Sequence, residues 1–358
     1  MVDSPDQDND MFEYVGNLHI HSRYSDGRRS IQEIARIAAE QRLDFIGITD
    51  HNTLRGLKDH GEGWRDRVFV LIGEEIGIAR HHYIVYGIDR DIIPNEGSPQ
   101  QVIDEVRTAG AIGFIAHPHE RGSPLSGGGR AYTWDDWSVT GYTGISVWCH
   151  CSGWKGTATN IFTALYNYYR HRWAFTGPYD ETLAVFDAES RRRHVSLIGS
   201  SDAHERPVGR RPFRVLVFPY EVSFRAVNMH LVLRERLTGR DDAEDRSAIL
   251  GALAAGNGFV GYGALRDARG FRFSAVWNDA VATMGDQIEF RDGLTLQVRV
   301  PARAMIHIVH NGTRTCETIG DTVSCEVKEK GVYRAQAFSL HRFHAPRPWI
   351  FSNPIYVR

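Results

Sequence analysis

The chain has 358 residues, of which 42% are hydrophobic and 24% charged, and its formal net charge is −2. This composition is typical of a globular protein, and the small charge predicts no general attraction to nucleic acid or to an anionic membrane. The first ten residues are acidic and polar, and no stretch looks long and apolar enough to span a bilayer. We therefore expect a cytoplasmic protein with one large domain and one smaller domain.

Alternating strands and helices are predicted up to about residue 265. Ser30-Ile31-Gln32-Glu33 is a capping box at the start of a helix, and Phe45–Thr49 is a short apolar strand. Ser98 and Pro99 begin another helix, with a favourable cap and a proline at its first position. Repeated units of this kind predict a parallel sheet.

The middle of the chain changes in composition. Residues 120–142 are rich in Gly, Ser, Arg and Trp, and Gly127–Gly129 predicts a long loop over the mouth of the sheet. Thr157–Phe175 predicts a helix whose Tyr and Phe side chains we expect to pack. Arg191–Arg193 are interpreted as cations near the carboxyl end of a helix.

After about residue 270 the hydrophobic pattern changes to period two, which is typical of half-buried strands. Leu294, Leu296, Val298 and Val300 alternate with polar residues, and Val332–Phe338 alternates again. Asn311-Gly312 between two such strands is a strong hairpin signal. We predict that residues 1–268 form the large domain and residues 269–358 a small β-sandwich domain.

The four cysteines predict no metal site. Cys149 and Cys151 are expected to pack, and a disulfide between Cys316 and Cys325 is compatible with a hairpin there.

Nine metal-capable side chains lie at the ends of short apolar runs. They are His19, His21, Asp50, His51, Glu75, His82, His117, Asp202 and His204. Imidazoles and carboxylates that converge at the rim of a sheet need a cation to offset repulsion and desolvation. Because these residues come from at least six runs, the sequence favours a closed barrel over an open, doubly wound sheet.

The motifs that carry these residues resemble the PHP (polymerase and histidinol phosphatase) superfamily, in the order of that family. They are Asn17–Ser22, Ser25–Gly27, Ile48–Asn52, Gly73–Ile76, His82 with Tyr86–Asp89, Ala116–Pro118 and Gly199–His204. The segment Val232–Gly239 and the tail Arg347–Val357 resemble the CehA/McbA branch. The resemblance implies a distorted (β/α)7 TIM-like barrel that binds two or three divalent ions, Zn, Mn or Fe.

The resemblance also implies three groups of metal ligands. They are His19, His21, Glu75 and Asp202 for one ion, Asp26, His51 and His204 for a second, and Glu75, His82 and His117 for a third. Some relatives carry a histidine at the position of Asp26. Glu74 is the rival of Glu75, and His81 is the rival of His82. Asp50 is expected to orient His51 or to cap the following turn.

The resulting hypothesis is a phosphoesterase that attacks a small phosphate ester with a metal-bridging hydroxide. Asp202, His204 and Glu75 are its candidate catalytic residues. Neither a Gly-x-Ser-x-Gly elbow nor a Gly-rich phosphate loop occurs in the sequence. Candidate substrate-binding residues are Arg23, His119, Arg206 and Arg210. Glu120 and His150 fall outside the metal pattern, and two interpretations stay open for them: substrate contacts or loop residues.

Two alternatives remain open. The first is hydrolysis of a carbamate or carboxylic ester, for which Trp134, Trp137, Trp148 and Trp154 offer aromatic surface. The second is a non-catalytic metal-binding regulatory module. The expected partner is a small-molecule phosphate ester, with no nucleic acid or membrane, and the sequence names neither the substrate nor the oligomeric state.

Overall fold

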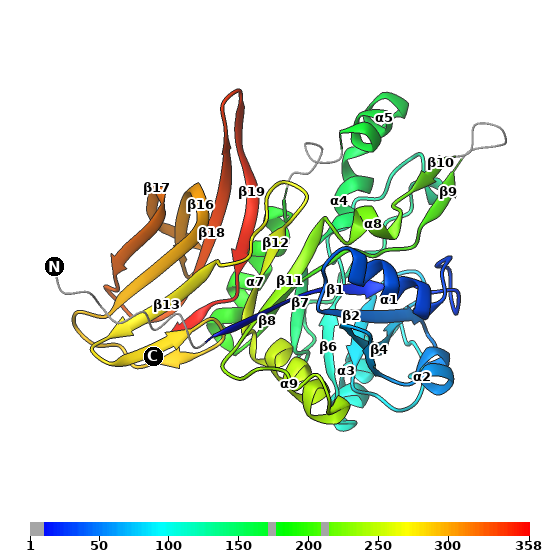
Figure 1. Cartoon of the computed structure of the whole chain (residues 1–358), viewed down its shortest axis with the longest axis horizontal. Coiled ribbons are helices and arrows are strands. Elements are labelled where there is room, and N and C mark those ends of the chain that lie inside the picture. The colour runs from blue at the N-terminus through cyan, green and yellow to red at the C-terminus, as the bar shows by residue number, and fades with distance from the viewer. Residues whose placement is uncertain (1–10, 171–176, 209–214) are drawn as a thin grey trace.

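The structure is a computed structural model, and it describes residues 11–170, 177–208 and 215–358. Strands of the first three quarters of the chain form a mixed sheet with helices around it (Figure 1). These strands are β1 (Phe12–Ile20), β2 (Phe45–His51), β3 (Gly63–Arg65), β4 (Val68–Ile76), β5 (Tyr83–Tyr86), β6 (Ile112–Ile115), β7 (Gly144–Cys149), β8 (Ser196–Ser200), β11 (Val227–Leu233) and β12 (Gly258–Tyr262). A separate two-stranded ribbon joins β9 (Arg206–Val208) and β10 (Val215–Val217).

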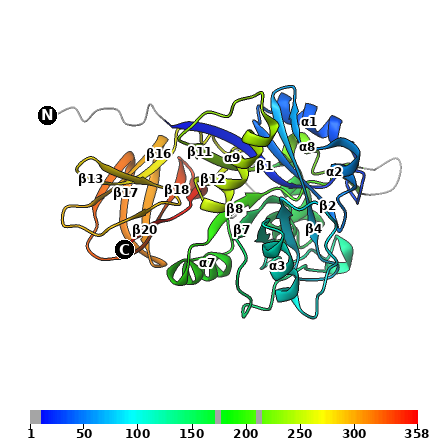
Figure 2. The same ribbon diagram turned by 90° about the horizontal axis from the view of Figure 1, so that it is seen from below.

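The helices lie mainly outside this sheet (Figure 2). They are α1 (Ile31–Glu40), α2 (Arg55–His60), α3 (Pro99–Thr108), α4 (His150–Thr157), α5 (Ile161–Tyr169), α7 (Asp180–Arg192), α8 (Tyr220–Ser223) and α9 (Asp242–Ala255). None of the helices in the described ranges has the length and apolar character needed to cross a membrane.

Local sequence signals account for several helix ends. The capping box before α1 is confirmed, because Ser30 Oγ accepts from Glu33 N and the Glu33 carboxylate accepts from Ser30 N. Arg191 and Arg192 occupy the last turn of α7, as predicted. Ser98 was expected to cap α3, but its side chain makes no capping hydrogen bond. Its backbone N–H donates to the Asn95 side chain of the preceding loop.

The segment around α5 differs from the prediction in two ways. One helix was expected over Thr157–Phe175, whereas α4 ends at Thr157 and α5 spans only Ile161–Tyr169. The last part of the predicted range lies outside the described residues. Large side chains of α5 are also exposed instead of packed: Phe162 is 80% exposed and Tyr169 is 73% exposed.

The sheet is mixed, not uniformly parallel. β1, β2 and β4 are parallel neighbours, and so are β6, β7 and β8. Between these two sets, β5 runs antiparallel to both β4 and β6. The amino end of β5 therefore lies at the same rim as the carboxyl ends of its parallel neighbours, where a barrel of this type carries its functional residues.

The predicted barrel does not close through a continuous ladder among the described strands. The segment that follows β8 meets β1 through an isolated parallel bridge between Ile20 and Ala203, and Ser201 N donates to Leu18 O. The register of β1 against β2 shifts between Asn17 and Ile20, and His19 adopts a positive φ of 65°. This bend turns the end of β1 toward the segment after β8, where His21 N donates to Ala203 O.

The C-terminal strands pack around a second hydrophobic cluster. They are β13 (Arg272–Trp277), β14 (Ala280–Thr283), β15 (Gln287–Ile288), β16 (Thr295–His310), β17 (Thr313–Glu326), β18 (Gly331–His341), β19 (His344–Ser352) and β20 (Ile355–Val357). The predicted hairpin joins β16 to β17, and Asn311 and Gly312 both have positive φ, as its turn requires. Alternation was also predicted for β18, but its first seven residues, Gly331–Ala337, are all buried, and α7 packs against this strand.

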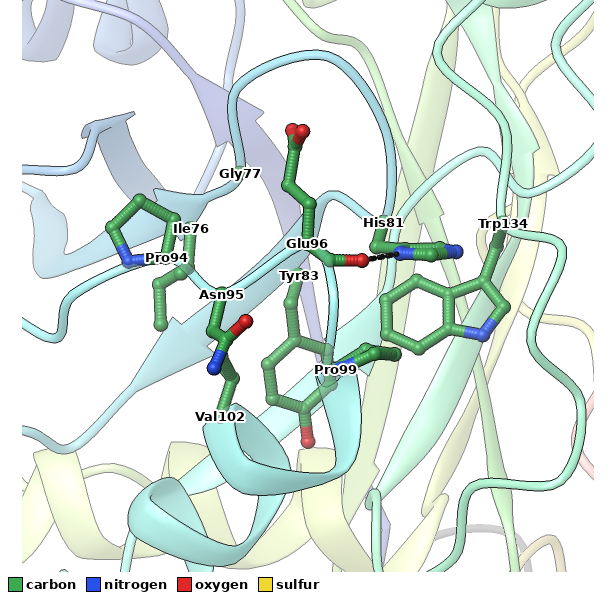
Figure 3. A pocket seen from close by; sticks show the side chains of 10 residues that line it. All are labelled: Ile76, Gly77, His81, Tyr83, Pro94, Asn95, Glu96, Pro99, Val102 and Trp134. Atoms are coloured by element: carbon green, nitrogen blue, oxygen red, sulfur yellow. Dashed lines mark hydrogen bonds between the residues drawn. The ribbon is translucent and has the colours of Figure 1, made fainter.

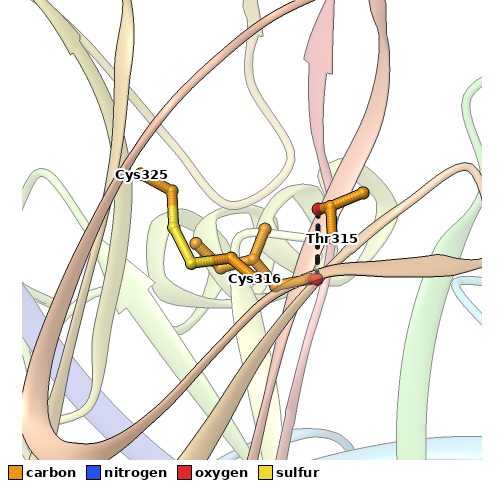
Figure 4. The surroundings of a disulfide bond; sticks show 4 residues. Thr315, Cys316 and Cys325 are labelled. Atoms are coloured by element: carbon orange, nitrogen blue, oxygen red, sulfur yellow. Dashed lines mark hydrogen bonds between the residues drawn. A yellow bond between two sulfur atoms is a disulfide. The ribbon is translucent and has the colours of Figure 1, made fainter.

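Cys316 and Cys325 form a disulfide, shown in Figure 4. Both residues belong to β17, so the bond does not cross a hairpin as expected. Along β16 their ladder partners are Ile308 and Leu296, and the register shifts between these points. The two halves of β17 approach each other because both long strands bend. Cys149 and Cys151 are free and buried.

The two parts of the chain are joined by backbone pairing and by buried side chains. β12 forms an antiparallel ladder with β19. Asn353 is fully buried and bonds both the N–H and the C=O of Leu197 in β8. Arg334 of β18 forms a bidentate pair with Asp187 of α7 at 2.6 and 2.7 Å. The C-terminal strands thus contribute directly to holding β8, which leads into the candidate site.

Candidate metal centre

The predicted ligands from six strands lie together at one rim of the sheet. His19 and His21 lie at the end of β1, His51 ends β2, Glu75 lies near the end of β4, and His82 directly precedes β5. His117 follows β6, and Asp202 and His204 follow β8. The antiparallel direction of β5 brings His82 to this rim, and Ala116 N donates to His82 O.

Glu75 lies at the centre of the cluster and is 1% exposed. Its Oε1 is 2.7 Å from His82 Nδ1 and 3.2 Å from His117 Nε2. Its Oε2 is 2.9 Å from His19 Nε2 and 3.2 Å from His21 Nε2, and it is 3.3 Å from His51 Nδ1. One carboxylate therefore contacts five imidazoles, and each of its oxygens faces a different set.

Asp202 and Asp26 complete two further groups. Asp202 Oδ1 is 3.4 Å from His19 Nε2 and 3.2 Å from His21 Nε2. Asp26 Oδ1 is 3.1 Å from His204 Nε2 and 3.8 Å from His51 Nε2. The ligand atoms of His19, His21, Glu75 and Asp202 lie within 4.8 Å of one another, as do those of His21, Asp26, His51 and His204.

The donor set fits divalent metal ions because many of its buried atoms have no hydrogen-bond partner. Unpartnered atoms include His19 Nε2, His21 Nε2, His82 Nε2, His204 Nε2 and Glu75 Oε2. Several of them face one another at about 3 Å without hydrogen-bond geometry, which is costly in a buried site. Imidazole nitrogen and carboxylate oxygen are the ligands that Zn, Mn and Fe accept.

Backbone carbonyls set the tautomers of two histidines. His204 Nδ1 donates to Asp202 O at 2.8 Å, and His117 Nδ1 donates to Tyr132 O at 3.2 Å. In each ring Nε2 is therefore the nitrogen that faces the cluster, and His117 Nε2 lies 3.2 Å from Glu75 Oε1. This arrangement, a carbonyl behind a histidine, is the usual support of a metal ligand.

The electrostatics of the cluster favour charged carboxylates beside imidazoles. Burial raises the pKa of Glu75, but the surrounding histidines, His19 first, outweigh burial and hold it well below its usual range. Burial lowers the pKa of His51 to about 4. Burial also lowers the pKa of His117, but its hydrogen bond to Glu75 and the nearby carboxylates raise it to about 9. Glu75 therefore carries a buried negative charge at the centre of the cluster, which a cation would offset.

Three of the candidate ligands have strained backbones. φ is 65° at His19, 26° at His117 and 54° at Asp202. Such conformations cost about 1–3 kcal/mol each in residues other than glycine, and they cluster at functional sites. Here they turn the three side chains into the rim at the points where their strands end.

The structure separates each ligand from its rival. Glu74 and Glu75 are consecutive in β4, and Glu74 points away to accept from Ile92 N, with burial raising its pKa to about 7. His81 lines a small neighbouring pocket (Figure 3), where its ring lies near Trp134 and Nδ1 donates to Glu96 O. The geometry therefore groups Glu75 and His82, not their neighbours, with the other predicted ligands.

Asp50 does not bond His51, contrary to one of the two expected roles. Its carboxylate accepts from the N–H and the hydroxyl of both Ser22 and Ser25. Asp50 therefore fixes the loop after β1, which carries Asp26, instead of the turn after His51.

A cavity of about 320 Å³ opens over the cluster. It is lined by Asp26, His51, Asn52, Glu75, Gly77, Ile78, His82, His117, Tyr132, Lys155, Asp202, His204 and Arg206. Tyr132 comes from the loop that was predicted to cover the mouth.

Of the three predicted substrate-binding residues that the structure describes, one is found in this lining. Arg206 lines the cavity and also pairs with Asp26. Arg23 is exposed and His119 bonds Thr182 Oγ1 and stacks on Trp137, so neither lines the cavity, and Arg210 lies outside the described residues.

The four tryptophans named for an aryl group are also absent from the described lining. Trp148 packs against Tyr262 and Phe351, and Trp154 packs against Phe218. Trp134 lines the small pocket of Figure 3.

Lys155, which no motif indicated, and Glu120, which the sequence left open as a substrate contact or a loop residue, both lie beside the cluster. Glu120 Oε2 is 4.0 Å from His117 Nδ1, and Lys155 Nζ donates to both Glu120 oxygens. The only sequence signal was that lysine is rare in this chain, which has four lysines among 42 basic residues.

Fold and site together define an α/β protein with a histidine- and carboxylate-rich metal centre. The family model of the PHP domain matches residues 17–200, and the chain belongs to this family. Over 115 residues it is 29% identical to the uncharacterized protein MJ1587 of Methanocaldococcus jannaschii, covering 29% of this chain and 67% of that protein.

Two solved structures are also similar to the chain. One is a two-domain protein of Bacteroides vulgatus that contains a predicted PHP-like metal-dependent phosphoesterase; identity is 13%, the TM-score is 0.42, and 98% of this chain and 96% of that chain are covered. The other is a metal-dependent phosphoesterase candidate from Bifidobacterium adolescentis; identity is 14%, the TM-score is 0.33, and the coverages are 55% and 91%.

Proposed function

We propose that the protein is a metal-dependent phosphoesterase that hydrolyses a small phosphate ester. The observation that carries the proposal is the Glu75 carboxylate, which contacts five imidazoles at a buried rim, below an open cavity. Oxygen- and nitrogen-rich centres with several ions suit phosphoryl transfer.

Three groups of side chains would hold the ions. They are His19, His21, Glu75 and Asp202 for the first and Asp26, His51 and His204 for the second. The third is Glu75, His82 and His117, where both histidines contact Glu75 Oε1. When bound, divalent ions acidify a water molecule and stabilise negative charge on a phosphoryl oxygen. We name Asp202, His204 and Glu75 as the residues on which this chemistry depends most.

The residues around the cavity favour a small, negatively charged substrate. Arg206 brings a guanidinium to the lining and pairs with Asp26. Asp50 holds the loop that positions Asp26. Ile78 lines the cavity, is 65% exposed and offers an apolar surface to the leaving group of the ester.

We also assign the chain to the CehA/McbA branch, on the resemblance of its tail. In that tail Trp349, Asn353 and Tyr356 are buried against the rest of the protein. The tail motif therefore has a structural role, which is to pack the C-terminal strands onto the first part of the chain. Hydrolysis of carbamates or carboxylic esters, known in that branch, is therefore the alternative that the substrate test has to separate.

The test is a panel of phosphomonoesters, phosphodiesters, aryl carbamates and aryl carboxylic esters, offered to protein loaded with Zn, Mn or Fe. Phosphate esters should turn over, and Asp202→Asn should lower kcat/KM by about a hundredfold or more at little change in folding. Asp104→Asn on the surface of α3 is the matched control and should leave the rate unchanged.

Turnover of carbamates but not of phosphate esters would replace the proposal by its alternative. Tight metal binding without turnover of any ester would indicate the non-catalytic module instead.

A further inference from the structure

Lys155 reaches the cavity over the metal centre from α4. The first turn of α4 is fixed to the segment after β8, because Cys151 N donates to Ser201 O beside Asp202. The Lys155 side chain is only 16% exposed, and it forms part of the cavity lining. A buried cation therefore lies beside the side chains that would bind metal.

Glu120 holds the ammonium in place. Lys155 Nζ is 3.1 and 3.2 Å from the two Glu120 oxygens, and the Glu120 side chain is completely buried. Burial lowers the pKa of Lys155, but its neighbours, Glu120 and Asp202 among them, outweigh burial and hold it well above its usual range. An ammonium has three N–H donors, and the pair with Glu120 accounts for two of them.

A lysine at position 155 is unusual in this chain, because most of its basic residues are arginines. The protein has four lysines among its 42 basic residues. A lysine ammonium is a compact point charge that can approach one oxygen in a crowded cavity, whereas a guanidinium needs a planar, two-pronged partner. The ring of Tyr132, 5.6 Å from Nζ, limits the space further.

We propose that Lys155 binds a negatively charged oxygen of the substrate and that Glu120 positions its ammonium for this contact. The inference deepens the proposed function and rests on it, and the class of ligand is an oxyanion such as a phosphoryl group. Ligand atoms of His117, Glu120 and Asp202 also lie within 4.8 Å of one another. In this cluster the Lys155 ammonium offsets the negative charge of the carboxylates.

The test measures binding of inorganic phosphate to the metal-loaded protein by calorimetry, which needs no turnover. Lys155→Met should raise the phosphate Kd about tenfold or more, because a charge-assisted hydrogen bond is lost, while metal content stays the same. Lys58→Met is the matched control: Lys58 lies in α2, is 58% exposed, and should leave the Kd unchanged.

A second variant separates ligand binding from a structural role. Lys155→Met leaves the buried Glu120 carboxylate unpaired and should lower the melting temperature. The double variant Lys155→Met, Glu120→Gln removes both charges and should regain much of that stability, yet still bind phosphate weakly.

Recovery of wild-type phosphate affinity in the double variant would overturn the inference, and so would an unchanged Kd in Lys155→Met. If the metal-loaded wild type binds no phosphate, the proposed function itself fails, and the inference falls with it.

Discussion

Replacing Glu75 by Gln tests the centre of the site most directly. The change keeps the volume but removes the charge and one of two oxygens that together contact five imidazoles. Loss of a group that only supports a metal ligand weakens metal binding about 10–100-fold. Loss of Glu75, which contacts the other predicted ligands directly, should therefore weaken it at least about a hundredfold.

This loss has a thermal consequence that can be worked out. At a metal concentration of about 100 times the wild-type Kd, one bound ion stabilises the protein by about 2.7 kcal/mol. A hundredfold weaker site retains only about 0.4 kcal/mol at the same concentration. The difference, about 2.3 kcal/mol, corresponds to roughly 3 °C in the metal-dependent shift of Tm for a chain of 358 residues.

The assay compares thermal unfolding with and without added metal, together with elemental analysis. Glu74→Gln is the matched control, since Glu74 is the adjacent buried carboxylate of β4 and faces away from the cluster. Burial raises the Glu74 pKa to about 7, so a neutral amide resembles a form that it already populates near neutral pH. Equal metal shifts and equal metal contents in the two variants would refute the assignment of Glu75.

Three further outcomes follow from the contacts. Asn353→Ala should destabilise the protein by about 3 kcal/mol or more in denaturant unfolding, because it leaves buried backbone groups of Leu197 and a neighbouring strand unpaired. Burial raises the pKa of Glu13, but its basic neighbours outweigh burial and hold the pKa below 4.5. The charged carboxylate therefore stabilises the fold above pH 4.5, and this stabilisation is lost as the pH falls through the lowered pKa. In curves of Tm against pH, Glu13→Gln should show a smaller loss of Tm at acid pH than the wild type. Asp50→Ala should weaken metal binding about 10–100-fold in metal titrations, by loosening the loop that carries Asp26.

Much of the local structure can be predicted from short stretches of sequence. The capping box at Ser30 and the turn at Asn311-Gly312 are confirmed, because the chemistry of a cap or a turn involves residues only a few positions apart. Ser98 shows the limit, since its hydrogen bonding is decided by the loop before it. The division of the chain near residue 268 stays a prediction.

Long-range contacts decided the features that sequence patterns missed. His119 and the tryptophans have the right chemistry for a substrate site, but they pack elsewhere. Conversely, Lys155 and Glu120 are 35 residues apart and belong to no recognisable motif, yet they form a buried pair beside the cluster. Amino-acid type alone does not say which surface a side chain meets.

The sequence by itself determined the metal-centre chemistry, because polar residues that end buried apolar runs must emerge at the rim of a sheet. It also determined the family, through motifs whose order the chain preserves. Only the tertiary structure decided the direction of β5, which brings His82 to the rim, and the contact of Glu75, already chosen over Glu74 from the family motif, with five imidazoles. Strand direction, and the contacts that side chains make, depend on pairing between segments far apart in the sequence. The free energy of that pairing cannot be judged from either segment alone.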